Sequence, residues 1–317
     1  MAKAVSEITL GVDVSKETLV ICDWESGELT ELANEAEQIG RWLRCLGAGP
    51  VRLAVEPTSS YHLALVEAAQ RRGCTVYLVN PRQLAHYRQA VNARNKTDPA
   101  DAWLLARYLA HEGEQLRPFE PASGKARELW ALLHRRAVVV QSRNQLTQSF
   151  REVRFSTRAL MSEIHRLLRR LDERLLALVR SLGWEADYRC ALSIPGIGPL
   201  NAVALVATFR RGAFASADAF VAYLGLDVRL RESGTYKGRR KLTKRGPSEL
   251  RRLLYCAARP ARSYAPFADY HQRQLDKGLP KIAANCILAR KLARIAFTLI
   301  ARQQTFQKQE IAYSQGP

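Results

Sequence analysis

The chain has 317 residues, 47% of them apolar, which is enough to bury a core and excludes a wholly disordered protein. This length allows about two domains. The formal net charge is +19, from 49 Lys and Arg against 30 Asp and Glu. The late apolar stretch 282–300 contains Arg290, Lys291 and Arg294, so no transmembrane helix is expected. The first ten residues also lack the long apolar segment of a signal peptide.

The cysteines are far apart in the sequence, and no two of them form a C-x-x-C pair. This spacing argues against a zinc site and against a disulfide scaffold, and it is typical of a protein from a reducing cytoplasm. The six are Cys22, Cys45, Cys74, Cys190, Cys256 and Cys286.

The basic excess is uneven along the chain. Residues 1–120 contain 13 basic and 16 acidic residues, residues 121–190 contain 14 and 7, and residues 191–317 contain 22 and 7. The net charges of the three segments are therefore −3, +7 and +15. An excess that is large and local indicates a polyanionic partner, most often nucleic acid. The alternative is a basic surface without a dedicated partner.

The first 120 residues predict a mixed sheet with helices on its faces, because three early β-rich runs are followed by alternating strands and helices. The expected strands are 8–14, 18–24, 28–32, 51–57 and 75–81. The expected helices are 36–46, 61–72, 81–91 and 99–111.

Pro118 and Pro121 mark the end of this α/β domain, which we place at 1–117. Residues 125–182 contain no proline and repeat apolar residues at helical spacing. This pattern predicts one or two long helices in a middle segment, 118–185, that can pair as a coiled coil. Residues 186–317 are expected to form a mainly helical C-terminal domain with a loop or hairpin near 227–247.

Four acidic residues stand where a sheet and a helix can bring them together. Asp13 ends the first strand, Glu56 ends the fourth, and Asp98 and Asp101 open a helix on one face. Phosphoryl transfer with two metal ions needs several converging carboxylates, because the cations must be neutralised and held about 3.5–4 Å apart. The order of these acids is that of an RNase H-like (RuvC-like) nuclease fold.

Each acid also has an ordinary structural interpretation. Asp98 followed by Pro99 is a favourable helix start, with Asp98 as the N-cap and Asp101 in the first turn. Asp13 can begin a turn, and Glu56 can pair with a surface base. The metal-site interpretation therefore depends on the four acids in combination.

Gly196 and Gly198 come directly before an apolar helix in residues 193–207, as in a helix-hairpin-helix turn. Glycines let a backbone approach a phosphate closely, and the following helix offers free N–H groups. Beside the +15 segment, this pattern favours contact with a DNA backbone. The alternative is an ordinary turn between two helices, with glycine as the helix stop.

The segment 226–255 is rich in basic residues. Residues 229–252 contain ten basic and two acidic residues, a cluster that would neutralise phosphates and make binding depend strongly on salt. Apolar residues flank the cluster and a helix is expected at 248–258, which favours a folded loop or hairpin over a flexible tail. The candidate nucleic-acid-binding residues are Lys237, Arg239, Arg240, Lys241, Lys244 and Arg245.

Two hydroxyl groups within this segment are candidate nucleophiles, Ser233 and Tyr236. A serine hydroxyl is a weak nucleophile unless a base or a metal activates it. The sequence offers no neighbouring histidine, so the residues alone give Ser233 little support.

The constellation as a whole resembles a known family, the DEDD transposases of the insertion-sequence family numbered one-ten, also called bridge recombinases, with their relatives the Piv-type DNA invertases. The N-terminal half of the resemblance is carried by GVDVSKETL (11–19), LAVEPTSSY (53–61), VNP (79–81) and NKTDPADAWLLA (95–106). The C-terminal half is carried by SIPGIGPLNA (193–202), FVAYLGL (220–226) and RESGTYKGRRKLTKRGPSELRRLLY (231–255). The resemblance covers essentially the whole chain.

The resemblance implies roles for the matching residues. Asp13, Glu56, Asp98 and Asp101 would be the ligands of a two-ion Mg²⁺ site. Ser233 would be the catalytic serine, which bonds transiently to a DNA phosphate, while Tyr236 is assigned to DNA contact or packing. The middle helices would mediate assembly into a dimer or tetramer that unites the two sites. The implied partners are donor and target DNA and a structured bridge RNA, in the cytoplasm of a bacterium and associated with its nucleoid.

The implied activity is a Mg²⁺-dependent DNA transposase or recombinase of an insertion sequence, in which Arg239, Arg240 and Lys241 are candidates for charge stabilisation by position alone. A Piv-type site-specific invertase is the alternative within the family. A RuvC-like nuclease that hydrolyses DNA with the four acids and forms no covalent intermediate is the rival enzyme. A nucleic-acid-binding protein without catalysis is the rival from another class.

Overall fold

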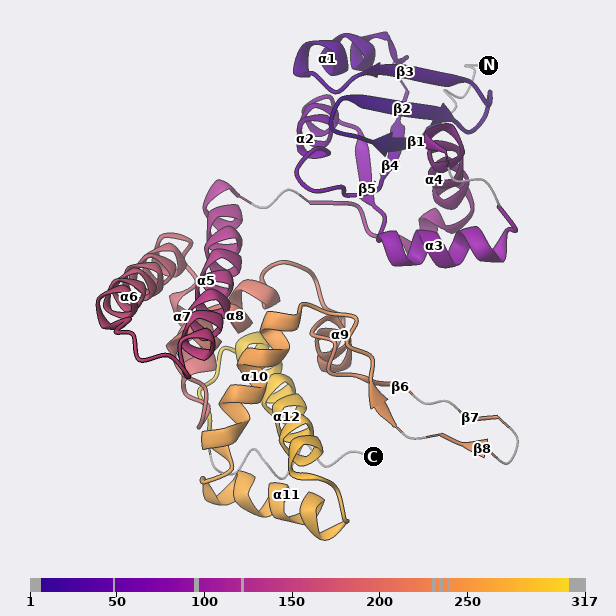
Figure 1. The fold of residues 1–317 in the computed structure, drawn as a ribbon. Helices are drawn as coiled ribbons and strands as arrows, with labels where there is room; N and C mark the ends of the chain where they lie inside the picture. Colours follow the sequence, from indigo (N-terminus) through magenta and orange to yellow (C-terminus); the bar gives the residue numbers. More distant parts are fainter. Residues whose placement is uncertain are drawn as a thin grey trace. The chain divides into compact units, whose positions relative to one another are not determined.

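The computed structural model describes residues 7–47, 49–93, 97–120, 123–229, 232–233, 236–238 and 240–307, with the backbone alone of Glu232, Tyr236 and Lys237. The chain divides into two compact units, Met1–Pro121 and Ala122–Pro317 (Figure 1). No described helix is long and apolar enough to cross a membrane. All six cysteines are free thiols, as their spacing predicts.

The first unit is built on a five-stranded sheet, counted over the described residues, in the order β3-β2-β1-β4-β5. The first three strands form an antiparallel meander, and β4 and β5 run parallel to β1. The strands are β1 (Ile8–Val14), β2 (Thr18–Asp23), β3 (Leu29–Ala33), β4 (Val51–Val55) and β5 (Thr75–Leu78).

Helices cover both faces of this sheet. The helices α1 (Ala36–Cys45) and α2 (Leu63–Arg71) bury apolar residues against one face, together with Leu10, Val12 and Val14 of β1. On the other face, α4 (Asp98–Glu112) packs against β1, β2 and β4, and α3 (Pro81–Ala90) packs against α4. A short 3₁₀ helix, Gly113–Gln115, follows α4.

The predicted α/β class of this unit is confirmed, and its elements lie close to their predicted bounds. An antiparallel meander that continues into parallel strands, with the first strand at the centre, is the sheet of RNase H-like domains. This topology brings the ends of β1 and β4 together, because the two strands are parallel neighbours.

The second unit is mainly helical, as predicted (Figure 1). Its helices are α5 (Gly124–Ser149), α6 (Arg158–Ser181), α7 (Glu185–Leu192), α8 (Pro199–Phe209), α9 (Ala217–Tyr223), α10 (Ser248–Ala261), α11 (Ala265–Asp276) and α12 (Lys281–Arg302). Their apolar faces form one core, in which α12 packs against α7, α8, α9, α10 and α11.

The middle segment forms two long helices, α5 and α6, that pack side by side. Ion pairs join them: Arg136 Nε lies 2.5 Å from Asp172 Oδ1, and Arg174 Nη2 lies 2.7 Å from Glu128 Oε1. We call this helix pair the α5–α6 hairpin. Leu129 of α5 and Leu175 of α6 are buried in the core of the second unit, so the hairpin packs into that core at one end. Packing joins the middle helices to the C-terminal helices. The division of the chain into 1–117, 118–185 and 186–317 stays a prediction.

Between α9 and α10 the chain forms a β arm, which we define as residues 227–243. The strands β6 (Val228–Arg229) and β9 (Lys241–Leu242) pair near its base, and β7 (Glu232–Ser233) pairs with β8 (Tyr236–Lys237) farther out. Asp227 and Thr243 lie at the base of the arm, where the Thr243 hydroxyl donates a hydrogen bond to the Asp227 carboxylate and the Thr243 backbone nitrogen donates one to the Asp227 carbonyl. Figure 1 shows the arm projecting from the helices of its unit, so the predicted hairpin is present.

Candidate active site

A close approach between a strand and a helix places the acidic residues. Gly11 of β1 faces α4, and a Cβ added to Gly11 would lie 2.1 Å from the Ala102 carbonyl oxygen and 2.2 Å from the Ala106 backbone nitrogen. The helix therefore lies directly on the strand, with alanines at the contact. Asp101 precedes Ala102, and Asp13 lies two residues after Gly11 on the same face of β1. This contact brings the first turn of α4 to the end of β1.

The register of the sheet brings Glu56 to the same place. Val12 of β1 pairs with Val55 of β4 in the parallel ladder, so Asp13 and Glu56 are the next neighbours along the two strands. Both side chains are partly buried. The prediction that these acids follow adjacent strand ends agrees with the register.

The charges of the other three predicted acids act on Asp13. Its pKa is raised from 3.8 to about 6, first by burial and then by the negative charges of Asp101, Asp98 and Glu56. A backbone hydrogen bond from Val14 acts in the opposite direction. The four predicted acids, distant in sequence, therefore form one carboxylate cluster at this end of the sheet.

The predicted N-cap role of Asp98 is wrong, because Thr97 is the N-cap of α4, whereas the predicted acid in the first turn is confirmed. The Thr97 side chain accepts a hydrogen bond from the Ala100 backbone nitrogen, and Asp98 and Asp101 lie in the first helical turn. The exposed Asp98 carboxylate is thus not needed as a cap.

Arg88 of α3 binds one member of the cluster. Its Nη2 lies 2.5 Å from Asp101 Oδ1, and both side chains are mostly buried, with 18% and 13% of their surface exposed. Nothing in the helical pattern of 81–91 distinguishes Arg88 from other surface bases, so its role could not be predicted from the sequence. Gly11 was also missed, although a glycine within an apolar strand is a recognised sign of close backbone approach.

The carboxylate cluster fits a divalent cation by its chemistry. Carboxylate oxygens are the ligands that Mg²⁺ takes in proteins. A cation would relieve the repulsion that, after burial, raises the pKa of Asp13. Over the described ranges, no three His, Cys, Asp or Glu side chains are arranged to hold a metal ion. Asp101 is paired with Arg88.

The second candidate site is on the β arm. Ser233 is exposed at the end of β7 and pairs in register with Tyr236 of β8. No described side chain hydrogen-bonds to the Ser233 hydroxyl, in agreement with the absence of a neighbouring histidine in the sequence.

The basic residues around the arm divide into two sets. Arg240, Lys241, Lys244 and Arg245 are exposed and have no ion-pair partner among the described residues, so they are available to a polyanion. The backbone of Lys237 lies in β8, and Arg239 lies outside the described residues. Arg251 and Arg252, which belong to the ten basic residues of 229–252, bind groups of the protein itself. Arg251 donates to the Gly246 carbonyl, and Arg252 pairs with Glu249 at 2.6 Å.

The two glycines of the predicted helix-hairpin-helix turn differ in their surroundings. Gly196 has a φ of +90°, and a Cβ there would lie 2.5 Å from Ala261 Cβ and 2.7 Å from the Ala257 carbonyl oxygen. This glycine is explained by packing of the turn against α10. Gly198 is the N-cap of α8, with a φ of −89° and open space where a Cβ would be. Phosphate contact at either glycine remains a prediction, which the surroundings favour for Gly198.

We expect Gly196→Ala to affect stability and Gly198→Ala to affect DNA binding. Gly196→Ala forces a side chain against backbone at positive φ and should lower the free energy of unfolding by about 1–3 kcal/mol or more. Gly198→Ala should change stability by less than about 0.5 kcal/mol and weaken duplex-DNA binding. Thermal melting and DNA titration measure the two effects. Unchanged DNA affinity in Gly198→Ala would remove this turn from the interface.

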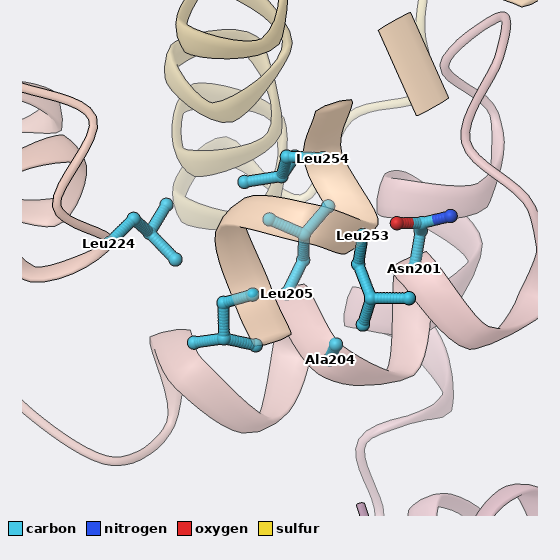
Figure 2. A pocket seen from close by; sticks show the side chains of 7 residues that line it. Asn201, Ala204, Leu205, Leu224, Leu253 and Leu254 are labelled. Carbon is cyan, nitrogen blue, oxygen red and sulfur yellow. The ribbon is translucent and has the colours of Figure 1, made fainter. Parts of the chain in front are cut away.

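A small pocket lies between α8 and α10 (Figure 2). Its walls are leucine and alanine side chains, except for Asn201, whose Oδ1 has no hydrogen-bond partner among the described residues. No titratable side chain lines it, so it has none of the groups needed for phosphoryl transfer. The lining residues are Asn201, Ala204, Leu205, Leu224, Leu250, Leu253 and Leu254.

Two family profiles match the chain in order along its length. The first, a DEDD transposase profile of the IS110 type, matches residues 10–153, which include the whole carboxylate cluster. The second, of transposases of the IS116/IS110/IS902 family, matches residues 188–272, which include the β arm.

Curated relatives agree with these profiles. The chain is 27% identical to the pilin gene-inverting protein of Moraxella lacunata, over 96% of this chain and 98% of that protein. It is 26% identical to the transposase for insertion sequence element IS1328 of Yersinia enterocolitica, over 87% of this chain and 82% of the relative. A RuvC of T. thermophilus in complex with a Holliday junction substrate aligns over 36% of this chain and 100% of that one, with 19% identity and a TM-score of 0.27.

The carboxylate cluster and the two profiles define the chain as a DNA transposase or recombinase of the DEDD type. It belongs to the IS110 family of transposases, and it is related to the pilin gene-inverting proteins.

Proposed function

We propose that this protein cuts and rejoins DNA with a divalent metal ion, Mg²⁺, at the carboxylate cluster and with Ser233 as the nucleophile. The observation that carries the proposal is the gathering of Asp13, Glu56, Asp98 and Asp101 at one end of the sheet, where burial and then the charges of the other three acids raise the pKa of Asp13. Such an arrangement is unfavourable for folding alone and favourable for binding cations.

The four acids would hold the metal, which when bound polarises the scissile phosphate and stabilises charge on its oxygens. Arg88 neutralises Asp101 in the protein as it stands. The Ser233 oxygen attacks phosphorus, the P–O bond to the departing strand breaks, and the phosphoserine ester retains the bond energy. A hydroxyl at the end of the partner strand then displaces the serine and rejoins the DNA.

The exposed bases of the arm support DNA binding around Ser233. Arg240 and Lys241 follow the serine on the returning strand, and Lys244 and Arg245 lie beyond the base of the arm. Phosphate oxygens are the partners that such exposed bases take up in nucleic-acid complexes. These residues would hold the strand while Ser233 reacts.

Assembly through the α5–α6 hairpin would complete the enzyme. Apolar side chains remain exposed along it, among them Val138 at 53%, Leu160 at 46% and Leu167 at 44%. Exposed apolar residues along a helix pair favour burial against another copy. A dimer or tetramer would let the carboxylate cluster of one copy act with the β arm of another.

A bridge RNA is part of the proposal on the strength of the family resemblance. A site-specific invertase is the second candidate function, because a pilin gene-inverting protein aligns with 96% of this chain. The DNA that flanks the gene distinguishes the two. A non-coding segment complementary to its own junctions supports an RNA-guided transposase, whereas an invertible segment supports an invertase.

The experiment that tests the proposal follows recombination of a plasmid carrying the flanking DNA. We expect recombinant junctions with Mg²⁺, and none when EDTA removes the ion. RNase treatment before the assay should also abolish the junctions. Recombination in EDTA would contradict the metal site. Recombination after complete removal of RNA would favour an invertase that needs no guide RNA.

A further inference from the structure

A basic cluster lies where α11 and α12 pack together, away from the β arm in sequence. Lys291 of α12 places its Nζ 4.2 Å from the centre of the Tyr270 ring of α11. Arg273 lies one helical turn after Tyr270 on α11, and Arg290 and Arg294 flank Lys291 on α12. The charges of the three arginines lower the pKa of Tyr270 against the stronger raising effect of burial. We call Arg273, Arg290, Lys291 and Arg294, with Tyr270, the α11–α12 cluster.

Lys291 is the unusual member of this cluster. It is only 5% exposed and occupies a helical position between the core residues Leu288 and Leu292. In the part of the chain that the structure describes, no carboxylate lies within 4.0 Å of its ammonium group. Burying an unpaired charge is costly, so this position is poorly explained by folding alone.

The cluster is open to solvent on its arginine side. Arg290 and Arg294 share a single acid, Asp218 of α9, and their side chains are 37% and 39% exposed. The Arg290 Nε is buried and has no hydrogen-bond acceptor among the described residues. Among the described residues, Asp218 is therefore the one acid in an ion pair with this cluster, and the Arg290 Nε donor remains unused.

An anion with several oxygens satisfies these groups. Guanidinium groups bind phosphate oxygens through paired N–H donors, and a lysine adds a point charge. We propose that the α11–α12 cluster binds a backbone phosphate of nucleic acid, at a site separate from the β arm. The inference rests on the proposed function, in which this chain handles DNA and a guide RNA.

The test uses the full chain and two labelled probes, a duplex DNA of arbitrary sequence and an RNA hairpin. Affinity is measured against salt for wild type, Arg273→Gln, Lys291→Met and the control Lys281→Gln. Lys281 is exposed on the same helix, ten residues and about 15 Å from Lys291. All three variants lose one charge.

For duplex DNA, the slope of log affinity against log salt should flatten by about 0.9 in Arg273→Gln and in Lys291→Met, and stay at the wild-type value in Lys281→Gln. The probe that shows the change identifies DNA or RNA as the source of the phosphate. Arg273 is exposed, so Arg273→Gln should fold normally. If wild type binds with a steep slope and Arg273→Gln keeps that slope for both probes, the cluster is structural. The inference then fails while the proposed function stands. If wild type shows no salt-dependent binding, the inference and the proposed function both fail.

Discussion

Asp13→Asn should abolish recombination and at the same time stabilise the metal-free protein at pH 8. The substitution keeps the size of the side chain and removes the charge that Asp101, Asp98 and Glu56 oppose. Strand transfer should fall at least about 100-fold, the scale on which loss of one charge-stabilising group slows an enzyme. The free energy of unfolding should rise by about 1–3 kcal/mol, since the pKa of Asp13 is raised from 3.8 to about 6.

The pH dependence gives the sign of this stability effect. Because the folded protein holds the Asp13 proton more tightly than the unfolded chain, wild type loses stability as pH rises from about 4 to about 6. Asp13→Asn should lack this loss, so the two proteins should melt alike below pH 4 and diverge above it. Adding Mg²⁺ at pH 8 should stabilise wild type more than the variant, because a ligand stabilises the state that binds it.

Asp23→Asn is the matched control for Asp13→Asn. Asp23 ends β2, and its carboxylate accepts hydrogen bonds from the backbone nitrogens of Glu25 and Ser26 at 2.8 Å and 3.2 Å. Asparagine can make the same turn, so recombination should persist. Near-normal strand transfer by Asp13→Asn, or equal losses in the two variants, would contradict the metal-site assignment.

Ser233→Ala should also abolish recombination, but with no change in folding or in DNA binding. Ser233 is exposed on the β arm, so its replacement should alter stability by less than about 0.5 kcal/mol. Affinity for DNA should persist, because the exposed Arg240, Lys241, Lys244 and Arg245 remain. The product to measure is the recombinant junction, alongside DNA titration and thermal melting.

Tyr236→Phe is the paired variant, since Tyr236 is the register partner of Ser233 and carries the competing hydroxyl. It should recombine DNA, because phenylalanine keeps the ring and loses only the oxygen. Recombination by Ser233→Ala together with its loss in Tyr236→Phe would make the tyrosine the nucleophile.

The placement of two acids at neighbouring strand ends could be predicted from the sequence, because strand ends are recognisable from apolar runs. Asp13 and Glu56 each follow such a run, and parallel pairing of β1 with β4 makes them neighbours. The close approach of α4 at Gly11 is harder to foresee, since it depends on Ala102 and Ala106 meeting that glycine in space. Arg88 depends on the packing of α3 against α4, which no periodicity encodes.

Other details depend on choices between similar residues. Thr97 and Asp98 are both good N-cap residues, and the structure uses the first of them. The break between α5 and α6 contains neither proline nor glycine, so the sequence pattern does not distinguish one long helix from two. Gly196 and Gly198 are alike in sequence, yet only Gly196 is required by a close contact. Such distinctions arise from tertiary packing and not from local preference.

The most direct test of the account is to locate the covalent bond between protein and DNA. Wild-type protein is incubated with Mg²⁺, guide RNA and a DNA substrate nicked so that the departing fragment diffuses away, and the trapped complex is digested for mass spectrometry. We expect a nucleotide adduct on the peptide that contains Ser233, and no adduct in Ser233→Ala. Cleavage of the DNA without any protein adduct, or an adduct on Tyr236, would contradict the serine mechanism.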